Sequence, residues 1–252
     1  MKKFALIGCG KIAGKHAESM TRVGKLAAVC DVVKEKRDAF AENYGANAYD
    51  SIENLLQHET EVDVVAVCTP NGLHAEHTIK SLQARKHVLC EKPLCLTVAA
   101  AWQIIETEKF CRRKLFVVKS TRYNPLLKAL KKAIQENSLG KIYSFHVSCL
   151  WNRPDSYYAD WRGTLFPDGG TLYTQFSHYI DALLWLLGDV AEVKGFKMNA
   201  AHAGSIEFED TGVAAMHLQN GAMGSLHWSV NSYRKNHEIA LTIVAEKGTI
   251  RL

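Results

Sequence analysis

The chain has 252 residues, 47% of them hydrophobic and 23% charged, with a formal net charge of +5. This balance is typical of a globular protein long enough for two domains, and it excludes disordered and collagen-like classes. No basic cluster is interleaved with aromatic residues, so we expect no nucleic-acid partner. The seven cysteines form no C-x-x-C pair, which favours a reducing, cytoplasmic location. No apolar run approaches the ~20 residues that span a bilayer, so no membrane partner is expected.

In the first 120 residues, short β-branched runs alternate with helical stretches, the pattern of a parallel sheet with crossover helices. The predicted strands cover residues 4–8, 26–31, 63–68, 87–90 and 115–119, with a minor strand near Ala48. The predicted helices cover residues 11–22, 34–43, 51–57, 73–84 and 98–112. The fold class is therefore α/β, beginning with an N-terminal Rossmann domain, a doubly wound parallel sheet, over residues 1–120.

The pattern changes over residues 121–252, which predict a C-terminal α+β domain. A helix opened by Pro125 and closed by Gly140 precedes a strand over 142–150, an Arg-rich and aromatic loop over 151–168, and a helix over 170–187. Strands over 212–219, 222–230 and 237–245 follow, the first two joined by an Asn-Gly hairpin turn, and they predict a largely antiparallel open sheet. The last fragment, 248–252, reads as a strand cut short. We therefore expect a truncated domain whose open edge is paired in a homo-oligomer, a dimer or tetramer.

A glycine turn follows the first predicted strand and opens the first predicted helix, the context that a dinucleotide fingerprint requires. In the sequence G-C-G-K-I-A over residues 8–13, Gly8 makes the tight turn and Gly10 lets the backbone approach a pyrophosphate at the helix N-terminus. Small Ala13 permits close packing of the helix on the strand. The predicted dinucleotide-binding residues of this turn are Gly8, Gly10, Lys11 and Ile12. The alternative is a purely structural turn.

Asp31 ends the second predicted strand, 23 residues after Gly8. An acid at this place accepts hydrogen bonds from the hydroxyls of the adenosine ribose and repels a 2′-phosphate, so the predicted cofactor is NAD. Lys34 and Lys36 lie nearby and keep NADP as the alternative. Asp31 could also serve only as the N-cap of the following helix.

Three further segments carry chemically reactive or polar residues. They are C-T-P-N-G-L-H over residues 68–74, E-K-P over residues 91–93, and Gly169-Gly170 followed by His178 and Asp181. The first two lie at the carboxyl ends of predicted strands, where ligands bind in open parallel sheets. Together with the glycine turn they resemble the glucose-fructose oxidoreductase and inositol dehydrogenase family, Gfo/Idh/MocA. The resemblance implies an NAD(P)-dependent oxidoreductase that acts on a CH–OH group.

The resemblance also implies roles for single residues. In the family the lysine of the E-K-P motif lies by the nicotinamide and the sugar hydroxyl, so Lys92 is implied to be catalytic. Glu91 is implied to contact the nicotinamide ribose. Taken without the resemblance, residues 91–93 read equally well as a turn between a strand and a helix. The residues implied to line the nicotinamide side are Thr69, Pro70, Asn71 and His74.

The family's second motif places an Asp four residues before a His on one helix, as a proton-transfer pair. Here His178 is present, but Thr174 takes the position of the Asp, so a simple Asp–His dyad is not expected. Asp181, at i+3 from His178, shares its helix face and could orient the imidazole ring instead. The alternative is an exposed polar stripe without a catalytic role.

A narrower match covers residues 152–158, 161–164 and 168–175. These segments are similar to bacterial enzymes that oxidise UDP-N-acetylglucosaminuronic acid at C3 during lipopolysaccharide biosynthesis, although those enzymes carry Asn-Gln where this chain has Thr174-Gln175. The side chains suit an anionic sugar, because arginines pair with carboxylate or phosphate and aromatic rings cover a sugar face. The residues expected to bind substrate are Lys119, Arg122, Arg153, Tyr158, Trp161, Arg162, Thr174, Gln175, His178 and Asp181.

These observations lead to one mechanistic hypothesis, hydride transfer from a ring carbon of a sugar to C4 of NAD, with Lys92 and His178 sharing the hydroxyl proton. Dehydrogenation of inositol or a free sugar, and reduction of a 3-keto sugar, remain alternatives. A regulator that senses NAD or sugar without catalysis is an alternative of another class. His74 and His77 are spaced i, i+3, but no further ligand is suitably spaced, so we expect no metal.

Overall fold

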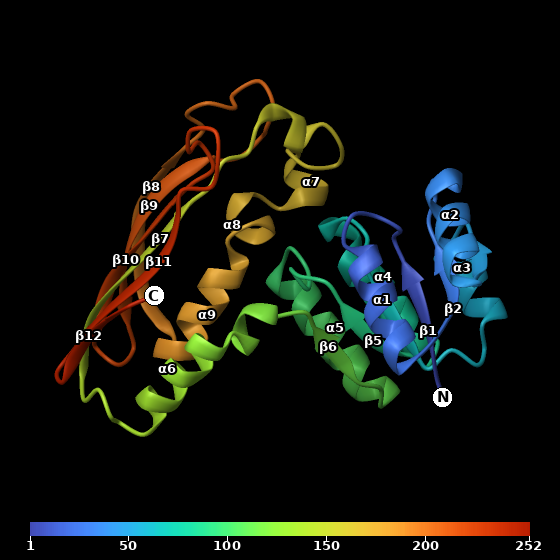
Figure 1. Ribbon diagram of the computed structural model, residues 1–252, viewed down its shortest axis with the longest axis horizontal. Helices are drawn as coiled ribbons and strands as arrows, with labels where there is room; N and C mark the ends of the chain where they lie inside the picture. The colour runs from blue at the N-terminus through green and yellow to red at the C-terminus, as the bar shows by residue number, and fades with distance from the viewer. The chain divides into compact units, whose positions relative to one another are not determined.

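The computed structural model describes residues 1–252 and divides the chain into two compact units, Met1–Val118 and Lys119–Leu252 (Figure 1). Each unit contains one six-stranded sheet and its own hydrophobic core. No helix in either unit combines the length and the apolar character needed to cross a membrane.

The N-terminal unit confirms the predicted doubly wound sheet. All of its strands are parallel, in the order β3-β2-β1-β4-β5-β6, and the order reverses between β1 and β4. The strands are β1 (Lys2–Ile7), β2 (Gly24–Cys30), β3 (Asn47–Tyr49), β4 (Val64–Val67), β5 (His87–Cys90) and β6 (Leu115–Val117). The helices are α1 (Ala13–Val23), α2 (Lys34–Tyr44), α3 (Ile52–His58), α4 (His74–Gln83) and α5 (Val98–Cys111), with the 3-10 helix η1 (Asn71–Leu73) before α4.

Helices cover both faces of this sheet, so its central strands are continuous apolar runs. Successive residues of β1 pack into opposite layers: Leu6 contacts the core under α1 and α2, whereas Ala5 and Ile7 contact the core under α3, α4 and α5. Helix α1 buries Ala13 and Ala17 at helical spacing against the first layer. Their small size lets α1 lie close to the sheet at the glycine turn.

The C-terminal unit contains a mixed sheet in the order β12-β11-β7-β10-β9-β8. All neighbouring strands are antiparallel except β7 and β10, which confirms the largely antiparallel sheet. The strands are β7 (Ile142–Leu150), β8 (Val190–Met198), β9 (Thr211–Leu218), β10 (Met223–Ser229), β11 (Glu238–Ala245) and β12 (Gly248–Arg251). The helices are α6 (Pro125–Gln135), α7 (Leu165–Asp168), α8 (Thr171–Thr174) and α9 (Ser177–Leu187), with 3-10 helices η2 (Ser120–Tyr123) and η3 (Asp155–Tyr158).

Two elements of this unit differ from the sequence-based expectation. Strand β8 was not predicted, because its residues are almost all exposed and its sequence mixes charged residues with a glycine. The predicted helix over 170–187 is two helices, α8 and α9, with the break at Gln175 and Phe176. The break directs the Phe176 ring into the core, where its centroid lies 5.1 Å from that of Trp151.

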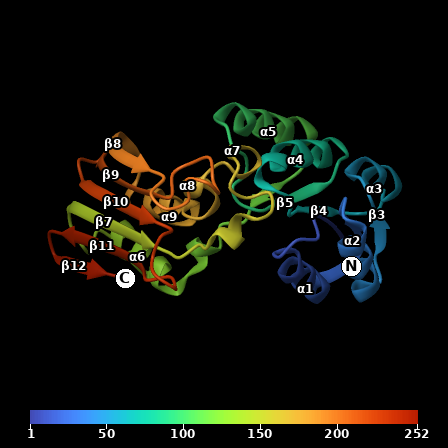
Figure 2. The ribbon, with the colours of Figure 1, turned by 90° about the horizontal axis from the view of Figure 1, so that it is seen from above.

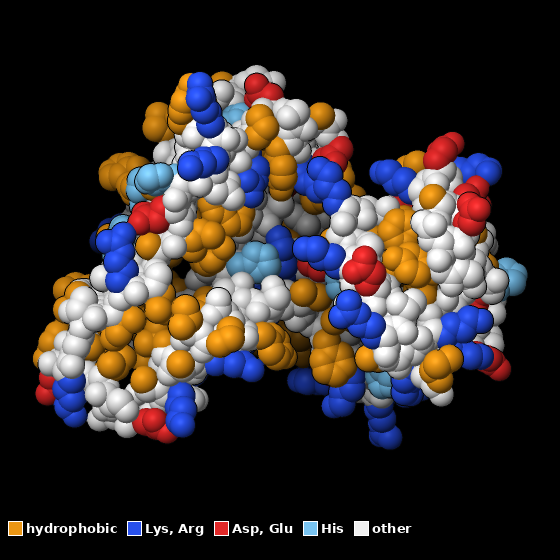
Figure 3. Space-filling model, viewed as in Figure 1, with side chains coloured by type: hydrophobic (Ala, Val, Ile, Leu, Met, Phe, Trp, Pro, Cys, Tyr) orange, Lys and Arg blue, Asp and Glu red, His pale blue; other side chains and the backbone are white.

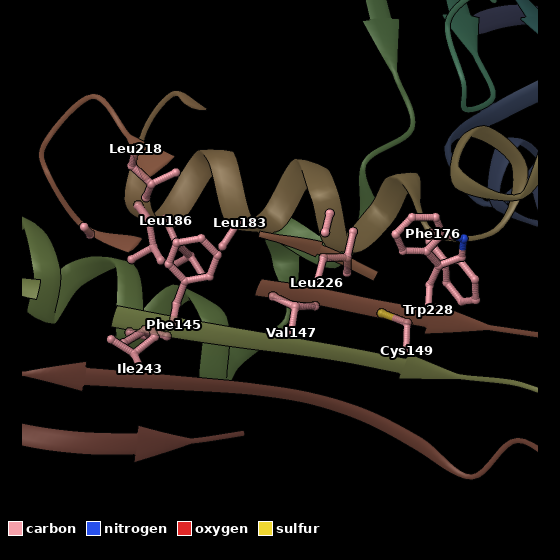
Figure 4. Packing of buried hydrophobic residues seen from close by; sticks show 14 of the residues in the cluster. Phe145, Val147, Cys149, Phe176, Leu183, Leu186, Leu218, Leu226, Trp228 and Ile243 are labelled. Carbon is pink, nitrogen blue, oxygen red and sulfur yellow. The ribbon is translucent and has the colours of Figure 1, made fainter. Parts of the chain in front are cut away.

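Helices α6, α8 and α9 all lie on one face of the C-terminal sheet, and no helix covers the other face (Figures 1 and 2). Leu183 and Leu186 of α9 face the strands, and Phe145, Val147 and Leu226 face the helix (Figure 4). This packing anchors α9, which carries His178, along most of its length. The uncovered face exposes several large apolar side chains: Phe196, Met198, Val213, Met223 and Val244.

Candidate functional site

The glycine turn between β1 and α1 has the backbone that its sequence suggested. Gly8 has a φ of +92°, and a Cβ at this position would lie 2.7 Å from the backbone carbonyl of Cys68 and 2.8 Å from the backbone nitrogen of Thr69. Only glycine fits both the conformation and the close approach of β1 to β4. The turn therefore lies at the point where the strand order reverses.

The next residues of the turn expose backbone to solvent. A Cβ on Gly10 would meet no protein atom within 4 Å. The N–H groups of Gly10, Lys11 and Ile12 donate to no backbone carbonyl, and all three residues are exposed ahead of the first turn of α1. Exposed N–H groups at a helix N-terminus favour an anion. This part of the chain therefore fits the pyrophosphate of a dinucleotide.

Asp31 links the carboxyl ends of β1 and β2. Its Oδ2 accepts a hydrogen bond of 2.7 Å from the Cys9 N–H, and its Oδ1 accepts one of 2.8 Å from the Val33 N–H at the start of α2. The Asp31 side chain thus caps the start of α2 and also contacts the glycine turn. Each carboxylate oxygen accepts more than one hydrogen bond, so these contacts are compatible with a ribose hydroxyl.

Glu91, at the end of β5, pairs with a residue that sequence reasoning missed. Its Oε1 lies 2.8 Å from Nε2 of His16 on α1, and its Oε2 accepts a hydrogen bond of 3.1 Å from the backbone N–H of Lys92. Although burial acts in the opposite direction, these hydrogen bonds hold the pKa of Glu91 below its usual value. The pair connects α1 to the segment that carries Lys92. No local sequence signal marks this contact, which spans 75 residues.

His74 lies inside the domain rather than on a surface that could line the nicotinamide, so its expected role is revised. Its side chain is 1% exposed, and its ring nitrogens lie 2.6 Å from the carbonyl oxygen of Pro93 and 2.8 Å from that of Thr69. Burial lowers the pKa of His74. The ring connects the loops after β4 and β5. Pro70 precedes η1 and is partly exposed, whereas Asn71 at its start is buried.

In the C-terminal unit, Thr174 contacts a buried carboxylate instead of replacing one. The Thr174 hydroxyl donates to Oδ1 of Asp168, and the Gly163 N–H donates to Oδ2 at 3.0 Å. Burial raises the pKa of Asp168. Asp168 therefore connects the aromatic loop to Thr174 of helix α8, and Thr174 lies four residues before His178 of α9.

Tyr158 and Gln175 are both buried, which corrects the expectation that the Tyr158 ring covers a sugar face. Tyr158 packs against Ile206 and Phe208, and its hydroxyl accepts a hydrogen bond of 3.3 Å from Nε2 of Gln175. Burial raises the pKa of Tyr158. The neighbouring residue, Tyr157, is the more exposed of the two tyrosines.

Tyr157 belongs to a stack of alternating aromatic rings and guanidinium groups, which we name the Arg–aromatic stack. The Arg153 guanidinium lies 4.6 Å from the ring centre of Trp151 and 5.1 Å from that of Tyr157. The Arg162 guanidinium lies 5.0 Å from the same Tyr157 ring and 4.5 Å from Trp161. Rings at these distances hold a cation without neutralising it. The alternation of Arg with aromatic residues was visible in the sequence, but the stacking order was not.

The two arginines of the stack differ in their ionic partners. Arg162 forms a salt bridge with Asp160, whereas Arg153 forms none. The Nη1 of Arg153 donates to the Asn152 carbonyl at 2.6 Å and to the Asn236 side chain at 3.1 Å, and its buried Nε has no hydrogen-bond partner. A guanidinium held by neutral groups retains its attraction for an anion.

Asp181 of α9 binds Arg122 with both carboxylate oxygens. The Nε and one Nη of Arg122 each donate at 2.7 Å, and Nζ of Lys119 lies 3.8 Å from Asp181. Burial lowers the pKa of Lys119, and the Asp181 carboxylate raises that of Arg122. Lys119 and Arg122, on the segment entering this unit, thus form one charged cluster with Asp181 of α9. His178 lies one turn before Asp181 on the same helix, partly exposed, with its ring 6.4 Å from that of Tyr179.

No group of three or more His, Cys, Asp or Glu side chains is placed to hold a metal ion. Lys and Arg side chains are spread among uncharged and hydrophobic ones on the face shown in Figure 3 instead of forming one patch.

The chain is similar to a solved sugar-nucleotide enzyme along nearly its whole length. The WlbA dehydrogenase from Bordetella pertussis, crystallised with NADH and UDP-GlcNAcA, superimposes with a TM-score of 0.95 and is 37% identical, over 99% of this chain and 73% of that one. Myo-inositol 2-dehydrogenase of Thermotoga maritima is 27% identical over 98% of this chain and 74% of its own length. D-glucoside 3-dehydrogenase of Escherichia coli is 32% identical over 74% of this chain and 54% of its own length.

Family models match both units. Residues 2–118 match an oxidoreductase family with an NAD-binding Rossmann fold, and residues 127–251 match the Gfo/Idh/MocA C-terminal domain. These matches agree with the reversed strand order, the glycine turn and the mixed sheet described above. The chain therefore belongs to the Gfo/Idh/MocA family of NAD-dependent oxidoreductases.

Proposed function

We propose that this protein oxidises the C3 hydroxyl of a UDP-linked N-acetylated glucuronic acid, with NAD as the hydride acceptor, in the biosynthesis of a surface polysaccharide. The observation that carries the proposal is the Arg–aromatic stack. It offers two guanidinium groups, one of them without a carboxylate partner, between rings that suit the face of a sugar. A substrate with a carboxylate and a diphosphate has the charge that this surface attracts.

The similarity to the WlbA dehydrogenase supports the same substrate class. That enzyme was crystallised with UDP-GlcNAcA, and its identity of 37% exceeds that of the inositol and glucoside dehydrogenases above. A neutral polyol such as inositol offers no group for the unpaired charge of Arg153. This difference in charge favours the uronic acid over the inositol reading.

In the proposed reaction the sugar carbon loses a hydride and its hydroxyl loses a proton. When bound, NAD supplies C4 of its nicotinamide ring as the hydride acceptor. We assign the proton to Lys92 and His178, whose side chains are a primary amine and an imidazole, both able to accept it. We assign Thr174, whose hydroxyl donates to the buried Asp168, to orienting the substrate beside His178. The guanidinium groups of Arg153 and Arg162 bind the anionic parts of the substrate.

We also propose that the protein acts as a cytoplasmic homo-oligomer, with the uncovered face of the C-terminal sheet as the interface. Five large apolar side chains are exposed on that face, and burying such a surface is favourable. Light scattering at micromolar concentration tests this. A stable monomer would contradict the proposal.

The experiment that tests the function is an assay of NADH formation with purified protein. UDP-GlcNAcA is compared with UDP-N-acetylglucosamine, which lacks the carboxylate, and with myo-inositol and a methyl glucoside. We expect NADH formation with UDP-GlcNAcA and at least about tenfold less with the others, since a charge-assisted hydrogen bond contributes about 1.5–3 kcal/mol. Faster oxidation of inositol or glucoside than of UDP-GlcNAcA would refute the substrate assignment. Binding of a sugar without any redox change would favour a sensor.

A further inference from the structure

A second histidine of the C-terminal unit lies outside the site described above and is held in an unusual way. His202, in the loop between β8 and β9, is 7% exposed, and Asp210 at the end of that loop is fully buried. The His202 Nδ1 lies 3.0 Å from Oδ2 of Asp210, and its Nε2 lies 2.8 Å from the carbonyl oxygen of Arg153. Both ring nitrogens thus face a group that can only accept a hydrogen bond.

The partners of Asp210 show that it is ionised in this arrangement. Its two oxygens accept hydrogen bonds from the N–H groups of Ala200 at 2.9 Å and Ala201 at 2.8 Å, as well as from His202. Although burial raises the pKa, these backbone N–H groups and the side chains of Asn231 and His202 bring the pKa of Asp210 down to about 2. A carboxylate with no proton to give requires the proton on Nδ1 of His202.

The Arg153 carbonyl places the same requirement on the other nitrogen, because a peptide oxygen has no proton to donate. Both hydrogen bonds form only if His202 is the doubly protonated imidazolium. A neutral ring keeps its proton on Nδ1, toward the negatively charged acceptor, and then turns the lone pair of Nε2 toward the Arg153 oxygen at 2.8 Å. Loss of one proton therefore converts an attraction into a repulsion at the backbone of Arg153.

We propose that the buried His202–Asp210 pair is a positioning device for Arg153, which makes recognition of the anionic substrate depend on the protonation of His202. The proposal rests on the proposed function, because it assigns Arg153 to substrate binding. The Arg153 backbone is fixed on one side by its N–H bond to the Val230 carbonyl at 2.8 Å and on the other by His202. Loss of the second bond removes one of these two anchors of the Arg153 backbone, so the guanidinium is held less rigidly in the stack.

The other groups around His202 do not supply the proton-dependent contact that His202 makes with the Arg153 carbonyl. The Tyr158 ring packs edge-on against the imidazole with centroids 5.3 Å apart, and burial keeps its hydroxyl protonated by raising its pKa. The Arg153 guanidinium lies over Trp151 and Tyr157, and Asp155 accepts a hydrogen bond from Ser205 of the same loop. Asp210 is the carboxylate in direct contact with the ring.

The direct test is nitrogen-15 NMR of the free protein with labelled histidine. We expect His202 to show two protonated ring nitrogens near neutral pH and to lose one as the pH rises. The signal is assigned by its absence in His202→Gln. A His202 ring with a single proton at and below neutral pH would overturn the proposal, and this measurement needs no substrate.

The functional test is the affinity for UDP-GlcNAcA by titration calorimetry with NADH present, from about pH 6 to pH 9. We expect wild-type affinity to fall at least about tenfold as His202 deprotonates. His202→Gln keeps a donor for the Arg153 carbonyl but has no proton to lose, so its affinity should stay near the low-pH wild-type value and change little with pH. His202→Ala should bind weakly at every pH, with NADH affinity unchanged in both variants.

His146→Gln is the matched control, because His146 is exposed on β7 and its side chain hydrogen-bonds to Ser225. It should reproduce the wild-type pH profile. The same pH profile in His202→Gln as in the wild type would overturn the proposal. If UDP-GlcNAcA fails to bind at any pH, the proposed function is refuted, while the protonation of His202 is still decided by NMR.

Discussion

Two glycines of the same turn should respond in opposite ways to the addition of one methyl group. Gly8→Ala and Gly10→Ala place that group two residues apart in the loop that follows β1. At Gly8 the backbone has a φ of +92° and the new Cβ would lie 2.7–2.8 Å from backbone atoms of Cys68 and Thr69. At Gly10 it would meet no protein atom within 4 Å. The pair separates the stability of the fold from the binding of the cofactor.

The magnitudes follow from these contacts. An L-residue in the left-handed region costs about 1–2 kcal/mol, and forcing a methyl against fixed backbone adds about 1–3 kcal/mol. Gly8→Ala should therefore lower the free energy of unfolding by about 2–5 kcal/mol, a fall in Tm of roughly 10 °C or more. Gly10→Ala should change stability by less than about 0.5 kcal/mol. Its methyl group would instead occupy the space of the pyrophosphate, weakening NADH binding at least about tenfold, or 1.4 kcal/mol.

Two measurements on each variant are sufficient. Thermal unfolding followed by circular dichroism gives the change in Tm without cofactor. NADH fluorescence titration gives the dissociation constant at a temperature where both variants are folded. Normal NADH affinity in Gly10→Ala would refute the place assigned to the pyrophosphate. A Gly8→Ala variant as stable as the wild type would refute the argument from its backbone conformation.

Three further substitutions test other parts of the structure. Lys92→Met should abolish NADH formation while leaving the NADH dissociation constant within about twofold, and substantial turnover would remove Lys92 from the mechanism. Gly212→Ala would place a Cβ 2.2 Å from the Trp228 ring, so thermal unfolding should show a loss of about 1–3 kcal/mol that the unhindered Gly248→Ala lacks. In the folded protein, hydrogen bonds lower the pKa of Glu91. The ionised carboxylate therefore stabilises the fold at pH values above the ordinary glutamate pKa of about 4.3. This stabilisation disappears as the pH falls and the carboxylate becomes protonated. Glu91→Gln should thus lower the free energy of unfolding, measured in urea, by about 1–3 kcal/mol at neutral pH and by progressively less in acid. A decrease that does not vary with pH would contradict the assignment to the His16 hydrogen bond.

Local sequence patterns were sufficient for most of the fold. In the N-terminal unit the strands are short apolar runs between helices, and burial on both faces makes such runs conspicuous. Strand β8 has the opposite character, because Val193 and Phe196 are exposed and only Lys194 and a glycine lie between them. The parallel pairing of β7 with β10 joins residues about 80 positions apart, and no turn between them defines the register. Edges and long-range pairings are therefore where the sequence was least informative.

The residues of the candidate site show the same difference between local patterns and long-range contacts. Gly8, Gly10 and Asp31 could be proposed from the sequence because a contiguous turn and a fixed spacing mark them. The pairing of His16 with Glu91 depends on the position of α1 against β5, which only the folded chain shows. Tyr157 and Tyr158 are neighbouring tyrosines in one loop, and nothing in their order says which ring is buried.

The two units differ in whether backbone groups or side chains form the proposed binding surface, and this difference bears on substrate choice. The dinucleotide contacts that we propose in the N-terminal unit use mainly backbone N–H groups, which require little beyond glycine and a helix N-terminus. The Arg–aromatic stack instead depends on side chains, and the loop that carries it is fixed by Asp168 at one end and by His202 near the other. A change at either anchor moves the guanidinium groups without touching the glycine turn. Relatives can therefore keep one cofactor and acquire different sugars, so the anchors of this loop are the positions at which specificity is best tested.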